Sequence, residues 1–152
     1  MEKRPLLEAG KTYWIRQTGN NNEPLFLEKR NFTFFIRLMR RHLPVAYDVQ
    51  AYALIETEIQ LVLTVKEGDV MPSQYAEKPY QPLSNLLNAY AKAINKSYGR
   101  SGSLFRVRYK RLPILNDMTL ADVIHQTHLL PARTGRKYTF YPYSSYTNPL
   151  SL

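Results

Sequence analysis

The sequence contains no cysteine among its 152 residues. Disulfide bridges and metal sites with thiolate ligands are therefore excluded, and the composition fits a reducing compartment. No apolar run approaches the roughly 20 residues of a membrane-spanning helix, and residues 1–10 lack the long apolar core of a signal peptide. These absences favour a soluble intracellular protein without membrane contact, and we expect it in the cytoplasm.

Acidic residues are scarce in the second half of the chain. Residues 77–152 contain eleven Lys or Arg but only Glu77, Asp117 and Asp122, whereas residues 1–76 contain ten Lys or Arg and nine Asp or Glu. Most of the formal net charge of +9 therefore belongs to the second half. Such a field attracts polyanions, so nucleic acid is the first partner indicated. Ordinary solvated surface charge is the alternative.

The length fits one domain, and 44% hydrophobic residues can build a core. We therefore expect a single domain over residues 1–152, with a core at about 12–146. An irregular tail rich in tyrosine and proline is predicted for residues 137–152.

Hydrophobic periodicity predicts the elements of the first half. Residues Thr12–Thr18 are typical of a short strand that ends in a turn at Gly19–Asn22. Apolar residues then recur at helical spacing from about residue 28 until Pro44, with arginines toward solvent. Two runs rich in β-formers, Ala46–Ile55 and Glu58–Val65, follow with two residues between them, which favours a hairpin.

The second half opens with a predicted loop over residues 66–82 and a helix that ends near Gly99. Residues Leu104–Leu112 alternate as a strand would, with Arg106, Arg108 and Lys110 on one face. Three cations on one face repel one another unless a polyanion or acidic partner lies against them. A last helix is predicted after a cap at Asn116 or Asp117, and it must end by Leu130 because Pro131 follows.

The resulting order, β-α-β-β-α-β-α, predicts an α+β protein of the ferredoxin-like class. In this arrangement an antiparallel sheet carries two helices on one face, with one helix added at the C-terminal end. Because this fold supports many functions, the function must come from local sequences.

Five collinear segments resemble the HUH single-strand transposases, and most closely the REP-associated tyrosine transposases. They are Gln17-Thr18-Gly19-Asn20-Asn21 before Pro24-Leu25-Phe26, Ala51-Tyr52-Ala53-Leu54 with Leu61-Val62-Leu63, residues 98–105 with Arg108-Tyr109-Lys110, residues 128–133, and residues 141–146. Each segment is weakly specific alone, but five in order are hard to obtain by chance.

The resemblance implies an enzyme that transfers strands of single-stranded or hairpin DNA. Two histidines on one strand face would hold a divalent cation such as magnesium or manganese. A tyrosine on the last helix would attack the phosphorus, and a polar residue four positions later would complete the metal shell.

In this sequence the four catalytic positions fall on residues without that chemistry. The histidine pair corresponds to Glu58 and Gln60, the nucleophile to Gln126 and the last ligand to Leu130. An amide does not attack phosphorus and leucine does not bind a metal, so we expect no catalytic residues, no bound metal and no cofactor.

Substitute sites are conceivable. Glu56, Glu58 and Gln60 share a hairpin face and offer oxygen ligands for a hard cation, although solvated sheet positions are the commoner explanation. His125 and His128 lie three residues apart, yet a zinc site needs further ligands that the sequence does not identify.

We therefore predict a catalytically inactive, transposase-derived protein that binds single-stranded or hairpin DNA and associates with the nucleoid. Unpaired bases of the bound DNA would stack on Tyr98, Tyr109 or Tyr143. Helix residues Arg37, Arg40 and Arg41 should matter less, because their half of the chain is nearly neutral. The expected phosphate contacts are Arg100, Arg106, Arg108, Lys110, Arg111, Arg133, Arg136 and Lys137.

Two alternatives stay open: an active transposase or nuclease with a relocated metal site, and a domesticated scaffold that binds RNA or protein. The sequence also leaves open the DNA target, the preference for DNA over RNA and the oligomeric state, a homodimer being one option.

Overall fold

The computed structural model describes residues 6–150, apart from the side chains of residues 117 and 118. Its strands are β1 (Thr12–Thr18), β2 (Tyr47–Ile55), β3 (Glu58–Val65) and β4 (Lys110–Ile114). Its α-helices are α1 (Lys29–His42), α2 (Ser73–Ala76), α3 (Gln81–Ser97) and α4 (Asp117–His128). Short 3-10 helices η1 (Asn20–Asn22), η2 (Gly68–Val70) and η3 (Leu130–Thr134) complete the chain.

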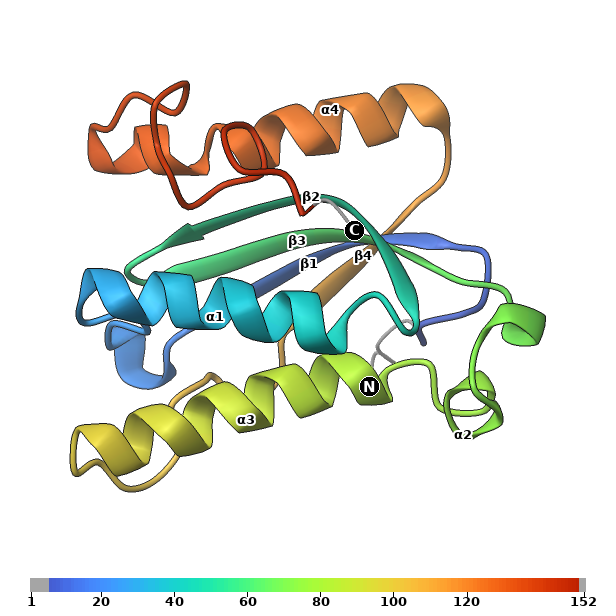
Figure 1. Cartoon of the computed structure of the whole chain (residues 1–152). Coiled ribbons are helices and arrows are strands. Elements are labelled where there is room, and N and C mark those ends of the chain that lie inside the picture. Colours follow the sequence, from blue (N-terminus) through green and yellow to red (C-terminus); the bar gives the residue numbers. More distant parts are fainter. Residues whose placement is uncertain (1–5, 151–152) are drawn as a thin grey trace.

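The strands form one antiparallel sheet in the order β2-β3-β1-β4. Helices α1 and α3 cover one face of this sheet, and α4 lies across the other (Figure 1). The predicted α+β, ferredoxin-like class with an added C-terminal helix is confirmed. Within residues 6–150, no helix is long and apolar enough to span a membrane.

Alternation along β1 and β3 decides which side chains reach each face. Tyr13 and Ile15 of β1 are buried in the cluster that also holds the side chains of α1 and α3. The intervening Trp14 packs instead beside Val62 of β3 and Val123 of α4. Even-numbered positions of β1 and β3 therefore face α4, which places Glu58 and Gln60 under that helix.

The loop between β1 and α1 is fixed by close backbone contacts. A Cβ atom at Gly19 would lie 1.9 Å from the carbonyl oxygen of Glu23, so only glycine fits there. Asn21 and Asn22 adopt positive φ angles of 56° and 59°, which asparagine tolerates better than most residues. The predicted turn at Gly19–Asn22 is thus confirmed.

The tail runs along the outer edge of β2. The Tyr143 carbonyl accepts from the Leu54 backbone N–H at 2.9 Å, and the Ser145 N–H donates to the Tyr52 carbonyl at 2.9 Å. These bonds satisfy backbone groups that a bare edge strand would expose. The tail has no helix or extended strand over residues 137–150; residues 151 and 152 lie outside the described residues.

Two predicted segments are wrong in part. The strand expected over Leu104–Leu112 begins only at Lys110, where β4 pairs with Arg16 of β1. Before it the chain is irregular, with one isolated bridge between Phe105 and Gly19. The predicted loop over residues 66–82 contains η2, the four-residue α2 and the first residues of α3.

Candidate functional site

A cleft of about 230 Å³ lies beneath the C-terminal end of α4. Gln60 comes from β3, Gln126 from α4 and Leu130 from the start of η3. Glu58 stands two residues before Gln60 on the same strand face, and the Gln60 side-chain amide donates to its carboxylate. The four positions singled out by the resemblance are therefore brought together. The other residues that line the cleft are Trp14, Arg16, Leu129 and Arg133.

Glu58 is the centre of a hydrogen-bonded network in this cleft. Its buried carboxylate accepts from Arg133 at 3.1 Å and from Arg16 at 3.4 Å. Gln60 donates to Glu58 through its nitrogen and accepts from the Trp14 indole N–H through its oxygen, at 3.2 Å. A carboxylate held by two guanidinium groups and an amide has little free capacity to bind a cation.

The two arginines retain contact with solvent. The Arg133 side chain is 53% exposed and that of Arg16 is 32% exposed, whereas the Glu58 side chain is only 10% exposed. A guanidinium carries five N–H donors, so each arginine keeps donors available to an anion. Lys110 pairs with Arg16 in the sheet register and thus projects to the same face. The cleft therefore holds two partly exposed arginines, Arg16 and Arg133, around one ion-paired carboxylate, Glu58.

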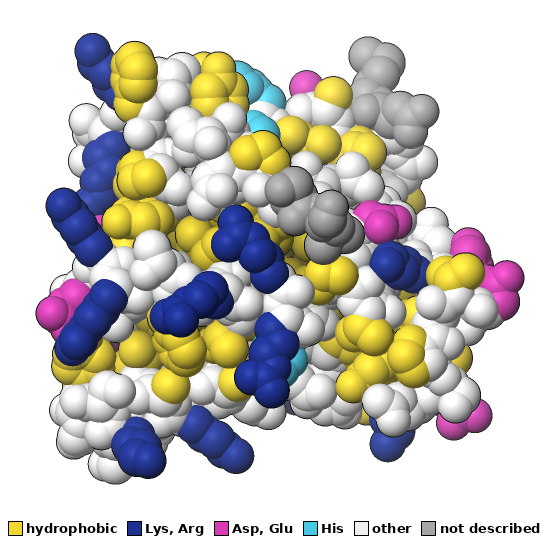
Figure 2. All heavy atoms as spheres, viewed as in Figure 1, with side chains coloured by type: hydrophobic (Ala, Val, Ile, Leu, Met, Phe, Trp, Pro, Cys, Tyr) yellow, Lys and Arg dark blue, Asp and Glu magenta, His cyan; other side chains and the backbone are white. Residues whose placement is uncertain are grey.

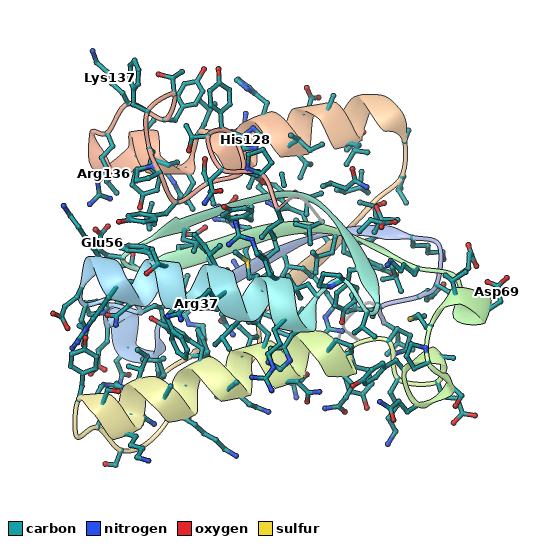
Figure 3. All side chains as sticks on the ribbon, in the orientation of Figure 1. Arg37, Glu56, Asp69, His128, Arg136 and Lys137 are labelled. Carbon is teal, nitrogen blue, oxygen red and sulfur yellow. The ribbon has the colours of Figure 1, made fainter. Side chains whose placement is uncertain are left out.

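Acidic and histidine side chains are dispersed over residues 6–150. Within residues 6–150, no three His, Asp or Glu side chains cluster closely enough to hold a metal ion. Glu56, weighed above as an oxygen ligand, instead forms a two-pronged ion pair with Arg136 at 2.5 and 2.7 Å (Figure 3). This hydrogen-bonded guanidinium lowers the pKa of the Glu56 carboxyl.

The two histidines of α4 have protein partners. His128 Nε2 lies 2.7 Å from the Ser145 hydroxyl, which ties α4 to the tail. Burial lowers the pKa of His128, and the nearby His125 adds to this effect. The His125 ring meets Tyr138 edge-on, with 6.5 Å between the ring centres. Both imidazoles pack between α4 and the tail.

The structure separates the eight predicted phosphate contacts into two groups. Arg100, Arg133 and Arg136 form ion pairs with Glu23, Glu58 and Glu56, and Arg111 stacks over the Tyr109 ring at 4.4 Å. The remaining four are exposed and have no acidic side chain within ion-pair distance among the described residues. These are Arg106, Arg108, Lys110 and Lys137.

The argument from a strand row is wrong for Arg106 and Arg108. Both precede β4 and lie in the irregular segment, so they do not share a strand face with Lys110. The reason is that the Arg106 backbone bonds across to Thr18, through its N–H at 3.0 Å, without continuing the ladder. Their exposure, rather than their alternation, makes them candidates for contact with DNA.

The three tyrosines predicted to stack on bases pack against, or form hydrogen bonds with, other residues of the protein. Tyr143 stacks on Phe32 with 4.3 Å between ring centres, and Tyr109 is only 9% exposed. The Tyr98 hydroxyl donates to Glu28 and accepts from the Asn31 amide at 3.2 Å. These rings are therefore poorly placed to stack on bases.

The largest group of exposed cations lies outside the predicted contacts. Helix α1 carries five Lys or Arg residues and α3 carries two, and neither helix contains an acidic residue. Figure 2, viewed as in Figure 1, shows Lys and Arg across the middle and lower part of the molecule, where α1 and α3 lie. Asp and Glu are found mainly toward the margins of this view. The absence of acids from both helices was readable in the sequence. Averaging over half the chain hid it. The cations are Lys29, Arg30, Arg37, Arg40, Arg41, Lys92 and Lys96.

The fold matches that of a solved transposase. No family model and no curated protein matches the chain. A structure of a REP-associated tyrosine transposase bound to a REP hairpin superposes with a TM-score of 0.69 over 96% of this chain and 82% of that one. The sequence identity is 14%, so the comparison establishes a shared fold.

Proposed function

We propose that this protein binds single-stranded or hairpin DNA and does not transfer strands. The proposal joins two supports, the transposase-like fold and the chemistry of the cleft. Glu58, Gln60, Gln126 and Leu130 converge beneath α4 and supply neither a nucleophile nor a set of metal ligands. This convergence is the observation that carries the proposed loss of activity.

Binding is supported by the distribution of positive charge. Arg16 and Arg133 present guanidinium donors at the cleft, and Lys110 lies on the same sheet face. On the opposite side, α1 and α3 form a basic surface, and neither helix contains an acidic residue. Phosphates neutralised by such side chains release counterions, which gives sequence-independent affinity. The solved transposase of the same fold is bound to a hairpin, which makes hairpin DNA the first ligand to test.

The test has a binding arm and a chemical arm. Fluorescence anisotropy with hairpin, single-stranded and duplex DNA, and with an RNA hairpin, measures affinity across a salt series. We expect hairpin DNA to bind with strong salt dependence. Tighter binding of RNA, or no binding of any nucleic acid, would favour the scaffold alternative.

In the chemical arm, the protein is incubated with each DNA and magnesium or manganese. We expect uncut DNA and no phosphotyrosyl adduct by mass spectrometry. Detection of an adduct would support an active enzyme with a relocated site, and the modified tyrosine would locate that site.

A further inference from the structure

A groove runs between α1 and α3, on the opposite side of the sheet from the cleft. The two helices lie side by side there (Figure 1), and a cavity of about 280 Å³ opens between them. Phe34 of α1 forms its apolar part together with Ala93 and Ile94 of α3. The polar residues that line it are Arg30, Asn31, Arg37, Ser97 and Tyr98. We call this cavity, with the exposed sides of α1 and α3 beside it, the α1-α3 groove.

Polar groups at one end of the groove are bound to one another. Arg30 donates to the Glu28 carboxylate at 3.1 Å. The Tyr98 hydroxyl also donates to Glu28, and it accepts from the Asn31 amide. Arg37, at the middle of α1 (Figure 3), differs from these groups because it forms no ion pair within residues 6–150. The middle of the groove therefore offers an uncompensated guanidinium beside an apolar cavity.

The basic residues of α1 weaken the helix that carries them. Lys29 and Arg30 lie in its first turn, where the helix dipole favours acidic residues such as the N-cap Glu28. Arg37 and Arg41 are four residues apart, a spacing at which like charges repel. The last turn is the exception, since cations there suit the dipole. An anionic partner that lies against the helix relieves such repulsion.

The apolar cavity distinguishes one anionic partner from another. A phosphate backbone has no alkyl side chain that could fill it. An acidic amphipathic helix carries carboxylates and apolar side chains together, and a groove between two helices suits its apolar stripe. Figure 2 shows exposed apolar side chains between the Lys and Arg side chains of this face. Charge and shape together therefore favour a helix with acidic and apolar residues.

We propose that the α1-α3 groove docks an acidic amphipathic helix of a partner protein. One apolar side chain would enter the cavity against Phe34 and Ala93, and carboxylates beside it would meet Arg37. The inference does not rest on the proposed DNA binding. If a duplex also contacts α1, the partner and the duplex compete for this face. Further carboxylates would reach the other exposed cations of the two helices, which include Arg40, Arg41, Lys92 and Lys96.

The probe is a fluorescein-labelled synthetic peptide of about 15 residues, with leucines at helical spacing and glutamates between them. One control peptide replaces the leucines with alanine and keeps the charge. A second replaces the glutamates with glutamine and keeps the leucines. Anisotropy titrations with the whole protein should show that each control binds about tenfold more weakly than the probe.

Equal binding of the leucine and alanine peptides would overturn the inference, because it would reveal a surface that takes any polyanion, DNA included. Equal binding of the glutamate and glutamine peptides would overturn it as well, since the cations would then have no part in docking.

Two pairs of variants locate the peptide. Arg37→Glu reverses the charge at the groove and should weaken binding about tenfold, whereas Lys137→Glu makes the same change of charge in the tail, on the α4 side of the sheet (Figure 3), and should not. Ala93→Phe fills the cavity and should abolish the advantage of leucine over alanine. Ala91→Phe lies on a part of α3 that lines a different cavity and should preserve that advantage. Because Arg37 and Lys137 are both exposed, the charge pair decides the question even if a phenylalanine variant does not fold.

The outcomes separate this inference from the proposed function. Peptide binding that survives both Arg37→Glu and Ala93→Phe would place the peptide elsewhere and overturn the docking. Failure to bind any of the three peptides would also overturn it, and would leave the proposed DNA binding untouched. Peptide binding by a protein that binds no DNA would support the docking and overturn the proposed function alone.

Discussion

The two faces of the sheet differ in how many of their arginines and lysines form ion pairs with acidic side chains. Under α4, Arg16 and Arg133 share the Glu58 carboxylate, and Arg136 pairs with Glu56. Over α1 and α3, the only ion pair among the described residues is that of Arg30 with exposed Glu28. The first face is therefore partly neutralised within the protein, whereas the second leaves most of its cations to solvent.

This difference shows why charge counted along the sequence misplaces charge in space. The first half is nearly neutral because its acids balance its bases, yet α1 itself contains no acidic residue. Glu56 and Glu58 sit at the β2-β3 turn, and Asp69 lies in the loop after β3 (Figure 3). The neutral half thus contributes the more basic helix. A polyanion responds to the local field rather than to the sum over residues 1–76.

The largest effect should come from removing charge on α1. Replacing Arg37, Arg40 and Arg41 with glutamine should lower the slope of log affinity against log salt by about 2.7 units on a duplex stem, if all three contact phosphates. Replacing Arg106, Arg108 and Lys110 should lower it by about 2 units on single-stranded DNA and change duplex binding little. Salt titrations of both triple variants with both DNAs measure these slopes.

The reverse pattern would break the comparison. Suppose that the variant at Arg106, Arg108 and Lys110 loses duplex binding while the α1 variant keeps it. The α1 surface then takes no part in binding, and the prediction from the sequence that Arg37, Arg40 and Arg41 matter less is right. Circular dichroism of both variants provides the folding control, since all six side chains are exposed.

A smaller effect is expected from the Glu58 carboxylate. Glu58→Gln removes the charge that Arg16 and Arg133 share, and should cost about 1–3 kcal/mol of unfolding free energy. This range is below that for a fully buried ion pair, because both arginines reach solvent. The same variant should bind DNA more tightly, since the cleft loses its negative charge. Urea denaturation and anisotropy measure the two changes.

The matched control for Glu58→Gln is Glu8→Gln. Glu8 pairs with Lys11 on the exposed surface, where ion pairs contribute little to stability. It should leave both stability and DNA affinity unchanged. A Glu58→Gln variant that loses DNA affinity would show that the cleft does not meet phosphate.

Local sequence patterns predicted most elements because their information is local. The hairpin of β2 and β3, helix α1 and helix α3 each carry their own periodicity and end signals. The strand predicted over residues 104–109 is absent, because its formation depends on pairing with a distant part of the chain. Its alternation of Phe105, Val107 and Tyr109 imitates a strand, but strand formation depends on which residues of β1 are available to pair.

The candidate site divides in the same way. The resemblance assigned Glu58, Gln60, Gln126 and Leu130 to one site. In the structure Gln60, Gln126 and Leu130 line one cleft, and Glu58 accepts a hydrogen bond from Gln60. No pattern predicted that Glu58 would bind Arg16 and Arg133, because the three side chains come from distant segments. Long-range side-chain partners require the fold first, and for that reason the availability of each cation could not be read in advance.

The smallest effect concerns pH, and it contrasts one histidine on each face. Burial lowers the pKa of His128 at the C-terminal end of α4, and it also lowers that of His42 at the end of α1, where Arg41 adds to the shift. The unfolded chain therefore binds protons that the folded protein resists. Stability should be fully present above the ordinary histidine pKa of about 6.5, and should fall as pH drops through the lowered values.

His128→Asn should remove part of this loss and His42→Asn another part, as measured by urea denaturation at pH 7.5 and 5. Because the two groups lie on opposite faces without shared partners, their effects should add. A double variant as pH-sensitive as the wild type would show that these two histidines do not govern the loss of stability between pH 7.5 and 5.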